Sequence, residues 1–339
     1  MSHDVQPPAH VHPPLSVSVV MCTYNGARFL QPQLESLLAQ TRLPDEIVIH
    51  DDRSDDATAD ILRDFEEKTR RSGITTRFRI NATNLGYRKN FQTALETATA
   101  DLLFLCDQDD LWHPRKIEQF CEAFQRRPAL SLLHCNARLV DERGQSLRMS
   151  LFEALDITPD TLASMHAGHA FDVLLRRNIV TGAAMAIRRQ ALSAALPFPE
   201  NEWIHDEWLA MITSLHSVVD TDTSMLIDYR QHGTNQVGVR KRGFKEKITG
   251  HAVSRRQWMD RFARKLDILL EHLREHPQLA SATTLAEIKR RMDHLLARTS
   301  LGSHFFARLP VIRAEWAKGN YQRYDVGLLS AISDLLSLH

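Results

Sequence analysis

Short apolar runs rich in β-branched residues alternate with stretches of helical periodicity over the first third of the chain, and this alternation constrains the fold most strongly. Such runs are typical of strands, whereas the spacing of Leu30, Leu34 and Leu37 places an apolar stripe on one side of a helix. Strands joined by crossover helices form a mainly parallel sheet that is covered on both faces. The sequence therefore predicts an α/β fold, with strands at residues 15–22, 45–50, 75–80 and 101–106.

A cluster of polar residues accompanies the end of each expected strand. The clusters are "TYN" after the first strand, "HDDRS" at the second, "NATNLG" after the third and "DQDD" after the fourth. In a parallel sheet the carboxyl ends of the strands lie at one edge, and ligands bind beyond that edge. We therefore expect a ligand site built from these clusters.

The last cluster holds carboxylates that repel one another. Asp107 and Asp109 are two residues apart, so in an extended segment they point the same way. Mg²⁺ and Mn²⁺ prefer oxygen ligands and commonly share them with substrate phosphates. The alternative is a solvated acidic turn in which Asp109 or Asp110 caps a helix that begins at Pro114. The position beside three other polar strand ends favours a metal site with Asp107 and Asp109 as ligands.

Beyond the first four strands the pattern is less regular. Residues 130–140, 179–189 and 224–230 have strand-like composition, and "HDEWLAMITSLH" begins a helix with its polar end. From about residue 240 onward the periodicity is helical. We expect a flexible Pro- and His-containing tail over residues 1–14, an α/β domain over 15–238 and a basic helical region over 239–339.

Composition excludes some classes of protein. Hydrophobic content of 43% and charged content of 25% are ordinary for a globular protein, and a net charge of zero argues against a general nucleic-acid binder. No apolar run is long enough to span a membrane. Cys22 and Cys106 each end an apolar run, so we interpret them as small core residues of a protein in the reducing cytoplasm.

The zero net charge hides an asymmetry between the two parts of the chain. From Arg240 to the end there are 19 Lys and Arg against 10 Asp and Glu. A basic region behind an acidic half suits peripheral contact with an anionic surface such as the inner face of the cytoplasmic membrane. A solvated helical face explains the charge count equally well.

Seven motifs in a fixed order resemble the family 2 glycosyltransferases of GT-A fold, and among them the bacterial rhamnosyltransferase-like group. They are "VSVVMCTYNG", "HDDRSDDAT", "NLGYRKNF", "FLCDQDDLWHP", "TGAAMAIRR", "HDEWLA" and "YRQHGTN". The resemblance covers roughly residues 16–238 and implies that "DQD" is the metal-binding motif, with Asp109 the stronger ligand and Asp107 nearby. The divalent cation, Mg²⁺ or Mn²⁺, would bridge the diphosphate of a nucleotide-sugar and stabilise the leaving group.

The resemblance also implies which residues hold the nucleotide-sugar. They are Thr23, Tyr24 and Asn25 for the base and ribose, Asp51 or Asp52 for the base, Asn84, Gly86, Arg88 and Lys89 near the diphosphate, Gln108 within the acidic motif, and Gly182 and Ala183 at the sugar and acceptor. A carboxylate at the second strand end accepts a hydrogen bond from the imide N–H of uracil or thymine, and we prefer Asp52 for this role. Capping of the next helix is the alternative, although Ser54 and Asp55 can provide it.

An inverting transfer needs a general base that takes a proton from the acceptor hydroxyl. "HDEW" stands where the family usually has a Glu-Asp pair, so the resemblance makes Asp206 the candidate base, with Glu207 a weaker contender and His205 in place of the Glu. From the residues alone, a helix cap is the better explanation of Asp206. His232 resembles a loop histidine that reaches the metal or the diphosphate in related enzymes, although a single loop histidine is usually unliganded.

These observations predict a cytoplasmic, metal-dependent, inverting hexosyltransferase that uses a dTDP- or UDP-sugar, with dTDP-L-rhamnose as the best single donor. The expected acceptor is a saccharide, in some pathways lipid-linked, in bacterial cell-surface polysaccharide synthesis. A sugar nucleotidyltransferase is an alternative, but it should carry a Gly-rich basic phosphate loop after the first strand, and "TYNGARFL" is not one. A non-catalytic glycan-binding module would need aromatic platforms, whereas 7% of residues are aromatic.

Overall fold

The computed structural model describes residues 14–233, 252–302 and 304–336. Strands and helices alternate in its first part as expected: β1 (Val17–Thr23), α1 (Ala27–Leu38), β2 (Glu46–Asp51), α2 (Thr58–Arg71), β3 (Thr75–Ile80), α3 (Tyr87–Thr97) and β4 (Leu102–Cys106). The strands β3, β2, β1 and β4 are neighbours in that order and pair in parallel, with Val20 of β1 opposite both Val48 of β2 and Leu105 of β4. The parallel half of the sheet is therefore confirmed.

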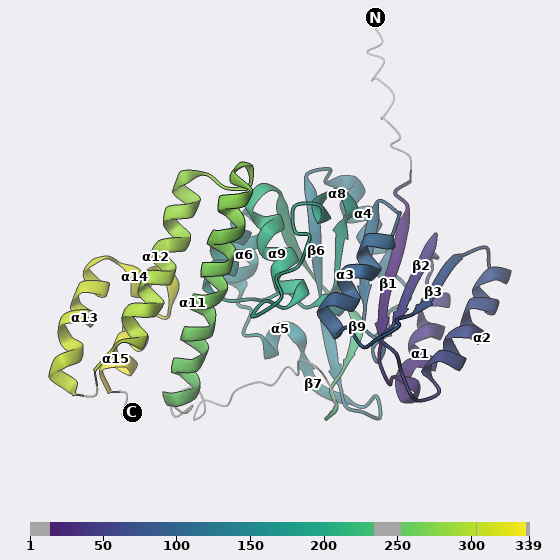
Figure 1. Ribbon diagram of the computed structural model, residues 1–339, viewed down its shortest axis with the longest axis horizontal. Helices are drawn as coiled ribbons and strands as arrows, with labels where there is room; N and C mark the ends of the chain where they lie inside the picture. The colour runs from purple at the N-terminus through teal and green to yellow at the C-terminus, as the bar shows by residue number, and fades with distance from the viewer. Residues whose placement is uncertain (1–13, 234–251, 303, 337–339) are drawn as a thin grey trace, which may run out of the picture.

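The second part of the sheet has mixed strand directions. Its elements are β5 (Leu111–Trp112), α4 (Lys116–Arg126), β6 (Leu130–Val140), β7 (Ser146–Ser150), α5 (Leu151–Ala154), α6 (Pro159–His166), α7 (Ala170–Arg176), η1 (Gly182–Ala184), β8 (Met185–Arg188), α8 (Arg189–Leu192), α9 (His205–His216) and β9 (Val218–Arg230). The order continues β4-β8-β6-β9-β5, with β8 antiparallel to both of its neighbours and β6 parallel to β9. Figure 1 shows the continuous sheet with helices on both sides.

Two hydrophobic cores lie on the two faces of this sheet because successive strand side chains point to opposite faces. Val20 of β1 belongs to the core that also contains Phe91 of α3 and Trp208 of α9, whereas Val19 belongs to the core that contains Leu34 of α1 and Phe120 of α4. Both faces of the central strands are therefore covered, and polar residues are displaced to the strand ends.

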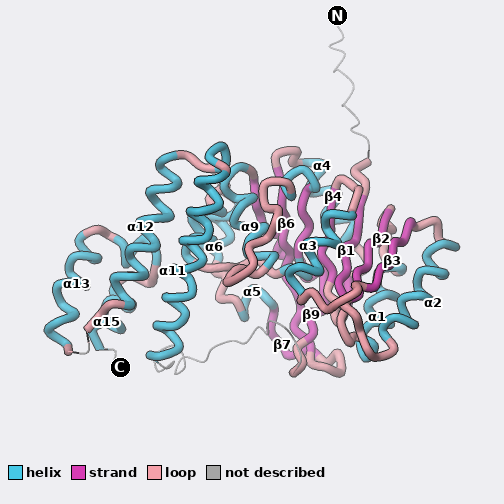
Figure 2. The backbone as a smooth tube through the Cα atoms, in the orientation of Figure 1, coloured by secondary structure: helices cyan, strands magenta, loops and turns pink. Residues whose placement is uncertain are grey.

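The last part of the chain is helical, as predicted. It comprises α11 (Ala252–Glu275), η2 (Pro277–Leu279), α12 (Ala282–Thr299), α13 (Phe305–Ala317), α14 (Asn320–Tyr324) and α15 (Leu328–Leu336). Phe262 and Leu266 of α11 share a core with Trp208 of α9, and Figure 2 shows α11 beside the sheet domain with α12 to α15 further away. The predicted tail and the boundary near residue 239 lie outside the described residues, so the division into domains stays a prediction.

Some local predictions were wrong. The second helix begins at Thr58 with Ala57 at its N-cap and no side-chain cap, because the Ser54 hydroxyl and N–H both donate to Asp51 instead. The strand expected over 179–189 is a short 3₁₀ turn at Gly182–Ala184 followed by β8. Within the residues that the structure describes, no helix is both long and apolar enough to cross a membrane.

Candidate active site

The loop after β1 is fixed by the side chain of Gln108, which lies within the acidic motif. The Tyr24 N–H donates to Gln108 Oε1 at 2.9 Å, and Gln108 Nε2 donates back to the Tyr24 carbonyl at 3.1 Å. A Cβ atom on Gly26 would lie 2.2 Å from Gln108 Oε1, so only glycine leaves room for this pair. The end of β1 and the end of β4 are therefore held together by one amide side chain.

Asp51 and Asp52 have different surroundings at the end of β2. Asp51 accepts hydrogen bonds from the hydroxyls of Thr23 and Ser54 and from the Ser54 N–H, and it is fully buried. Asp52 accepts the N–H groups of Leu85 and Gly86 at 2.7 and 2.8 Å. Asp52 therefore shapes the loop that follows β3, and it also lines the central cavity, whereas Asp51 does not.

The loop after β3 contains the residues expected near a diphosphate. Asn84 Nδ2 donates to the carbonyl of Asp52, and Gly86 has a φ of +76°, which a side chain would strain. Both residues line the cavity. Arg88 instead donates to the carbonyls of Pro199 and Trp203, and Lys89 is exposed on α3. Neither cation lines the cavity, so their predicted diphosphate role has no support from their positions.

The three carboxylates of the acidic motif differ in their environments. Burial, followed by the charges of Asp109 and Asp206, raises the pKa of Asp107 to about 7. The Oδ2 atom of Asp109 lies 2.7 Å from the Nε2 atom of His232. Asp110 faces the protein interior, where Oδ1 accepts the Arg230 N–H at 2.8 Å and burial raises its pKa well above the usual value. Neither Asp109 nor Asp110 caps α4, whose N-cap is Arg115.

The donor set at this edge fits a hard divalent cation that takes further ligands from a substrate. Asp107 and Asp109 line the cavity together with His232, and carboxylate oxygens are preferred ligands of Mg²⁺ and Mn²⁺. Burial, followed by the neighbouring carboxylates, raises the pKa of Asp107, and a bound cation would relieve this concentration of negative charge. Among the described residues no group of three or more His, Cys, Asp or Glu side chains forms a metal cage, so phosphate oxygens would have to complete the coordination.

Asp206 lies in the first turn of α9, which begins at His205. Its Oδ2 atom accepts the Gly182 N–H at 2.7 Å, and its Oδ1 atom accepts the Glu207 N–H at 2.7 Å. Burial raises the pKa of Asp206, and these two N–H groups oppose the rise. The N-cap residue of α9 is Ile204, without a side-chain cap, so Asp206 is not the capping residue.

The neighbours of Asp206 come from distant parts of the chain. His205 stacks on the ring of Phe91, with ring centroids 4.2 Å apart, and burial lowers the pKa of its imidazole to about 3, so the ring is neutral. Glu207 forms an ion pair with Lys265 of α11, and both side chains are largely buried. Burial raises the pKa of Glu207, and Lys265 opposes the rise. The C-terminal helical region thus contacts the helix that carries Asp206.

One cavity of about 560 Å³ joins these groups. Of the residues predicted to form the site, those that line it are Thr23, Tyr24, Asn25, Asp52, Asn84, Gly86, Asp107, Gln108, Asp109, Gly182, Asp206 and His232. The other predicted residues, which do not line it, are Asp51, Arg88, Lys89 and Ala183. Ala183 is buried, and its carbonyl accepts a hydrogen bond from Lys116 at 2.7 Å.

Sequence reasoning missed several residues around the cavity. Tyr87, Phe91 and Tyr229 line it, but their spacing within a helix or a strand reads as ordinary core. Lys116 is fully buried, 3.5 Å from the centroid of the Trp112 ring, and burial lowers its pKa to about 8. It is a cation that opposes the raised pKa of Asp107, and nothing in its sequence context distinguishes it from a surface lysine.

An acidic cavity lies at the carboxyl ends of the parallel strands. This arrangement is typical of α/β proteins that bind nucleotides. The sequence profile of Glycosyl transferase family 2 matches residues 18–194, which are more than half of the chain. The chain belongs to glycosyl transferase family 2, and it is a glycosyltransferase of GT-A fold.

Two relatives extend the comparison. An uncharacterized glycosyltransferase of Nostoc sp. is 27% identical over 225 residues, which are 65% of this chain and 66% of that relative. An uncharacterized protein of Mycobacterium tuberculosis is 25% identical over 345 residues, covering 95% of this chain and 90% of its own length. The likeness to the mycobacterial protein therefore includes the C-terminal helical region.

Two solved structures share the fold. S. aureus TarS 1-349 in complex with UDP-GlcNAc has a TM-score of 0.51 and 17% sequence identity, over 95% of this chain and 88% of that chain. The mannosyltransferase PcManGT from Pyrobaculum calidifontis in complex with GDP-Man and Mn²⁺ has a TM-score of 0.51 and 16% identity, over 98% of this chain and 88% of that chain.

Proposed function

We propose that this protein is a metal-dependent, inverting hexosyltransferase that moves a sugar from a nucleotide-diphosphate sugar to a saccharide acceptor. The observation that carries the proposal is the meeting of Asp107, Asp109 and Asp206 at one cavity, where burial, followed by the charges of the other two carboxylates, raises the pKa of Asp107. A pair of acidic ligands for a cation and a separate carboxylate base are the two components that such a transfer requires.

The donor is a dTDP- or UDP-sugar, with dTDP-L-rhamnose as the first candidate because of the resemblance to rhamnosyltransferase-like proteins. The structural neighbours bind UDP-GlcNAc and GDP-Man, which supports a nucleotide-sugar as the class of donor. Asp52 is the carboxylate at the cavity that is able to meet a base imide N–H, since it accepts three hydrogen bonds, from the Asn81 amide and the Leu85 and Gly86 N–H groups, and a carboxylate offers about four acceptor sites. The product extends a bacterial cell-surface polysaccharide.

Asp109 and Asp107, with His232 beside them, would hold the divalent cation, and Mn²⁺ in the complex of the mannosyltransferase supports this choice. When bound, the cation supplies neutralisation of the negative charge that develops on the departing diphosphate. Gln108 fixes Tyr24 and thereby orders the loop on which the base and ribose are expected to lie.

Asp206 takes the proton from the acceptor hydroxyl. Its raised pKa makes it a stronger base than a solvated aspartate, and the Gly182 and Glu207 N–H groups hold its carboxylate in one orientation. The neutral ring of His205 packs between Phe91 and the backbone of Gly182, so it supports the wall of the cavity and adds no charge to it.

A panel of nucleotide-sugars with Mg²⁺ or Mn²⁺ tests the proposal through release of the nucleoside diphosphate. We expect release from a dTDP- or UDP-sugar and none in EDTA. Asp109→Ala should remove the activity, whereas Lys89→Ala, at an exposed residue on α3, should retain it. Release that is equal with and without a divalent cation would refute the metal-dependent part of the proposal.

A further inference from the structure

The helix α15 is oriented with a carboxylate toward the protein and leucines toward solvent. Asp334 is buried, at 3% exposure, whereas Leu328, Leu329 and Leu336 are 61%, 69% and 64% exposed. An amphipathic helix normally buries its apolar stripe. These three leucines therefore contribute little to the packing of this chain and are free to contact another apolar surface.

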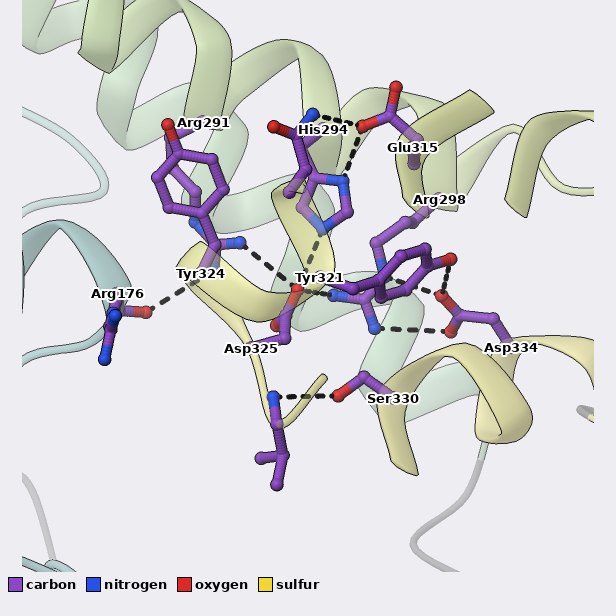
Figure 3. Close-up of polar contacts among 12 residues, drawn as sticks. Arg176, Arg291, His294, Arg298, Glu315, Tyr321, Tyr324, Asp325, Ser330 and Asp334 are labelled. Atoms are coloured by element: carbon purple, nitrogen blue, oxygen red, sulfur yellow. Dashed lines mark hydrogen bonds and ion pairs between the residues drawn. The ribbon is translucent and has the colours of Figure 1, made fainter. Parts of the chain in front are cut away.

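Polar contacts hold α15 in this orientation, as Figure 3 shows. Arg298 of α12 donates to Asp334 at 2.7 Å, and the Tyr321 hydroxyl donates to the same carboxylate at 2.8 Å. Arg308 of α13 donates to the carbonyl of Leu335 at 3.1 Å. These bonds are directional, so they fix which side of the helix faces solvent.

The beginning of α13 adds aromatic side chains next to the end of α15. The Arg308 contact joins the first turn of α13 to the last turn of α15, and Phe305 and Phe306 in that first turn are exposed, Phe306 at 81%. We call the exposed side chains of Phe305, Phe306, Leu328, Leu329, Ile332 and Leu336 the α13–α15 face. A large exposed apolar surface of this kind marks an interaction site.

The exposed charged side chains between Phe305 and Leu336 are all cations. Every carboxylate between Phe305 and Leu336 points inward: Glu315 and Asp334 are buried, and Asp325 is enclosed by ion pairs with Arg298 and His294. These cations are Arg313, Lys318 and Arg323, of which Lys318 forms an ion pair with Glu315 and Arg323 forms one with Glu287. The exposed surface of this segment is therefore apolar and carries cations, with Arg313 exposed on the helix that also carries Phe306.

We propose that the α13–α15 face is a docking surface for an anionic lipid bilayer. Apolar side chains that enter the headgroup boundary, together with Lys and Arg that attract anionic lipids, are the combination that interfacial helices use. A protein partner fits less well, because leucine is under-represented among the residues that dominate protein interfaces.

The proposal deepens the proposed function and rests on it in one respect, since a lipid-linked saccharide acceptor gives the enzyme a reason to lie on a membrane. In Figure 1 the strand β1 runs from the top of the view toward the bottom, and α15 lies toward the bottom of the view. The end of α15 and the carboxyl ends of the parallel strands therefore face the same side of the molecule. A bilayer at this end would lie on the side where the strand ends form the cavity.

Sedimentation with vesicles tests the proposal without any donor or acceptor. The full chain is mixed with neutral phosphatidylcholine vesicles or with vesicles that also contain phosphatidylglycerol, at low and high salt. We expect binding to the anionic vesicles that weakens at high salt. Arg313→Glu should weaken it roughly tenfold or more, because each cation near the surface changes affinity about fivefold and the substitution reverses a charge. Phe306→Ser with Leu329→Ser should weaken it at least tenfold.

Matched controls separate this surface from general effects. Leu147→Ser and Arg70→Glu change an exposed leucine on β7 and an exposed arginine on α2, and binding should not change. Asp109→Ala should abolish sugar transfer but leave vesicle binding intact, so the two proposals fail separately. Equal binding of the wild type and the Phe306/Leu329 double variant would overturn the proposal. So would a dimer, measured by light scattering, that the double variant dissociates.

Discussion

Replacing Asp206 by Asn tests the catalytic assignment with the smallest change of shape. Asp206 accepts one N–H from Gly182 and one from Glu207, each at 2.7 Å and each on a different oxygen. Asparagine offers a single acceptor oxygen, so its NH₂ group must face one of these two donors. We therefore expect two separable effects, a loss of proton acceptance and a loss of one local hydrogen bond.

The magnitudes of the two effects differ enough to be measured apart. One buried N–H without a partner lowers the free energy of unfolding by about 1–3 kcal/mol, so the variant should remain folded. Loss of a general base lowers the rate by roughly 10²–10⁴-fold, which corresponds to about 3–5 kcal/mol in the activation free energy. Nucleotide affinity should stay within about twofold, since the proposed cation ligands are on a different strand end.

The assay measures turnover, urea unfolding and nucleotide affinity on one purified preparation of Asp206→Asn. Glu207→Gln is the matched control, because Glu207 lines the same cavity from the same helical turn. Turnover within tenfold of the wild type would refute the assignment of Asp206 as base. If Glu207→Gln were then the inactive variant, the base would be Glu207.

Three further predictions concern other parts of the molecule. Calorimetric titration of UDP or dTDP should show weak binding in EDTA and tighter binding with Mn²⁺. Asp109→Ala should remove this difference more completely than Asp107→Ala. An affinity in EDTA equal to that with Mn²⁺ would contradict the metal site. Lys265→Met should lower the free energy of unfolding by roughly 3 kcal/mol, because it leaves Glu207 buried without its cation. Adding Glu207→Gln should restore part of this loss. An unchanged denaturation midpoint in Lys265→Met would show that the ion pair does not stabilise the fold. Burial alone would raise the pKa of Asp325, but the hydrogen bond with His294 and the charge of Arg298 hold this pKa well below its usual range. A lowered folded-state pKa stabilises the protein above the unfolded pKa near 4, and this stability is lost as the pH falls further. Unfolding followed from pH 7 to pH 3 should therefore be less pH-dependent in Asp325→Asn than in the wild type.

Much of the fold was predictable because it follows from local patterns. The alternation of apolar strands and amphipathic helices specified the order of β1 to β4, and the two-residue period placed Val19 and Val20 in opposite cores. The polar clusters at the strand ends specified the edge where the cavity lies. Helix starts were predicted less well, since the bonds of Ser54 to Asp51 depend on how a loop folds back on its strand.

The sequence by itself determined the kinds of residue at the site, because strand ends bring Asp52, Asp107 and Asp109 to one edge wherever a parallel sheet forms. Only the tertiary structure decided what each of them contacts. Packing placed Asp206 on the Gly182 N–H and brought Lys265 from α11 to Glu207, contacts between residues far apart in the chain. It also turned the carboxylates of the last three helices inward, so the charge of their surface differs from the charge of their sequence. A charge count sums every residue of a segment, whereas the charge of its surface depends on which side chains the fold leaves exposed.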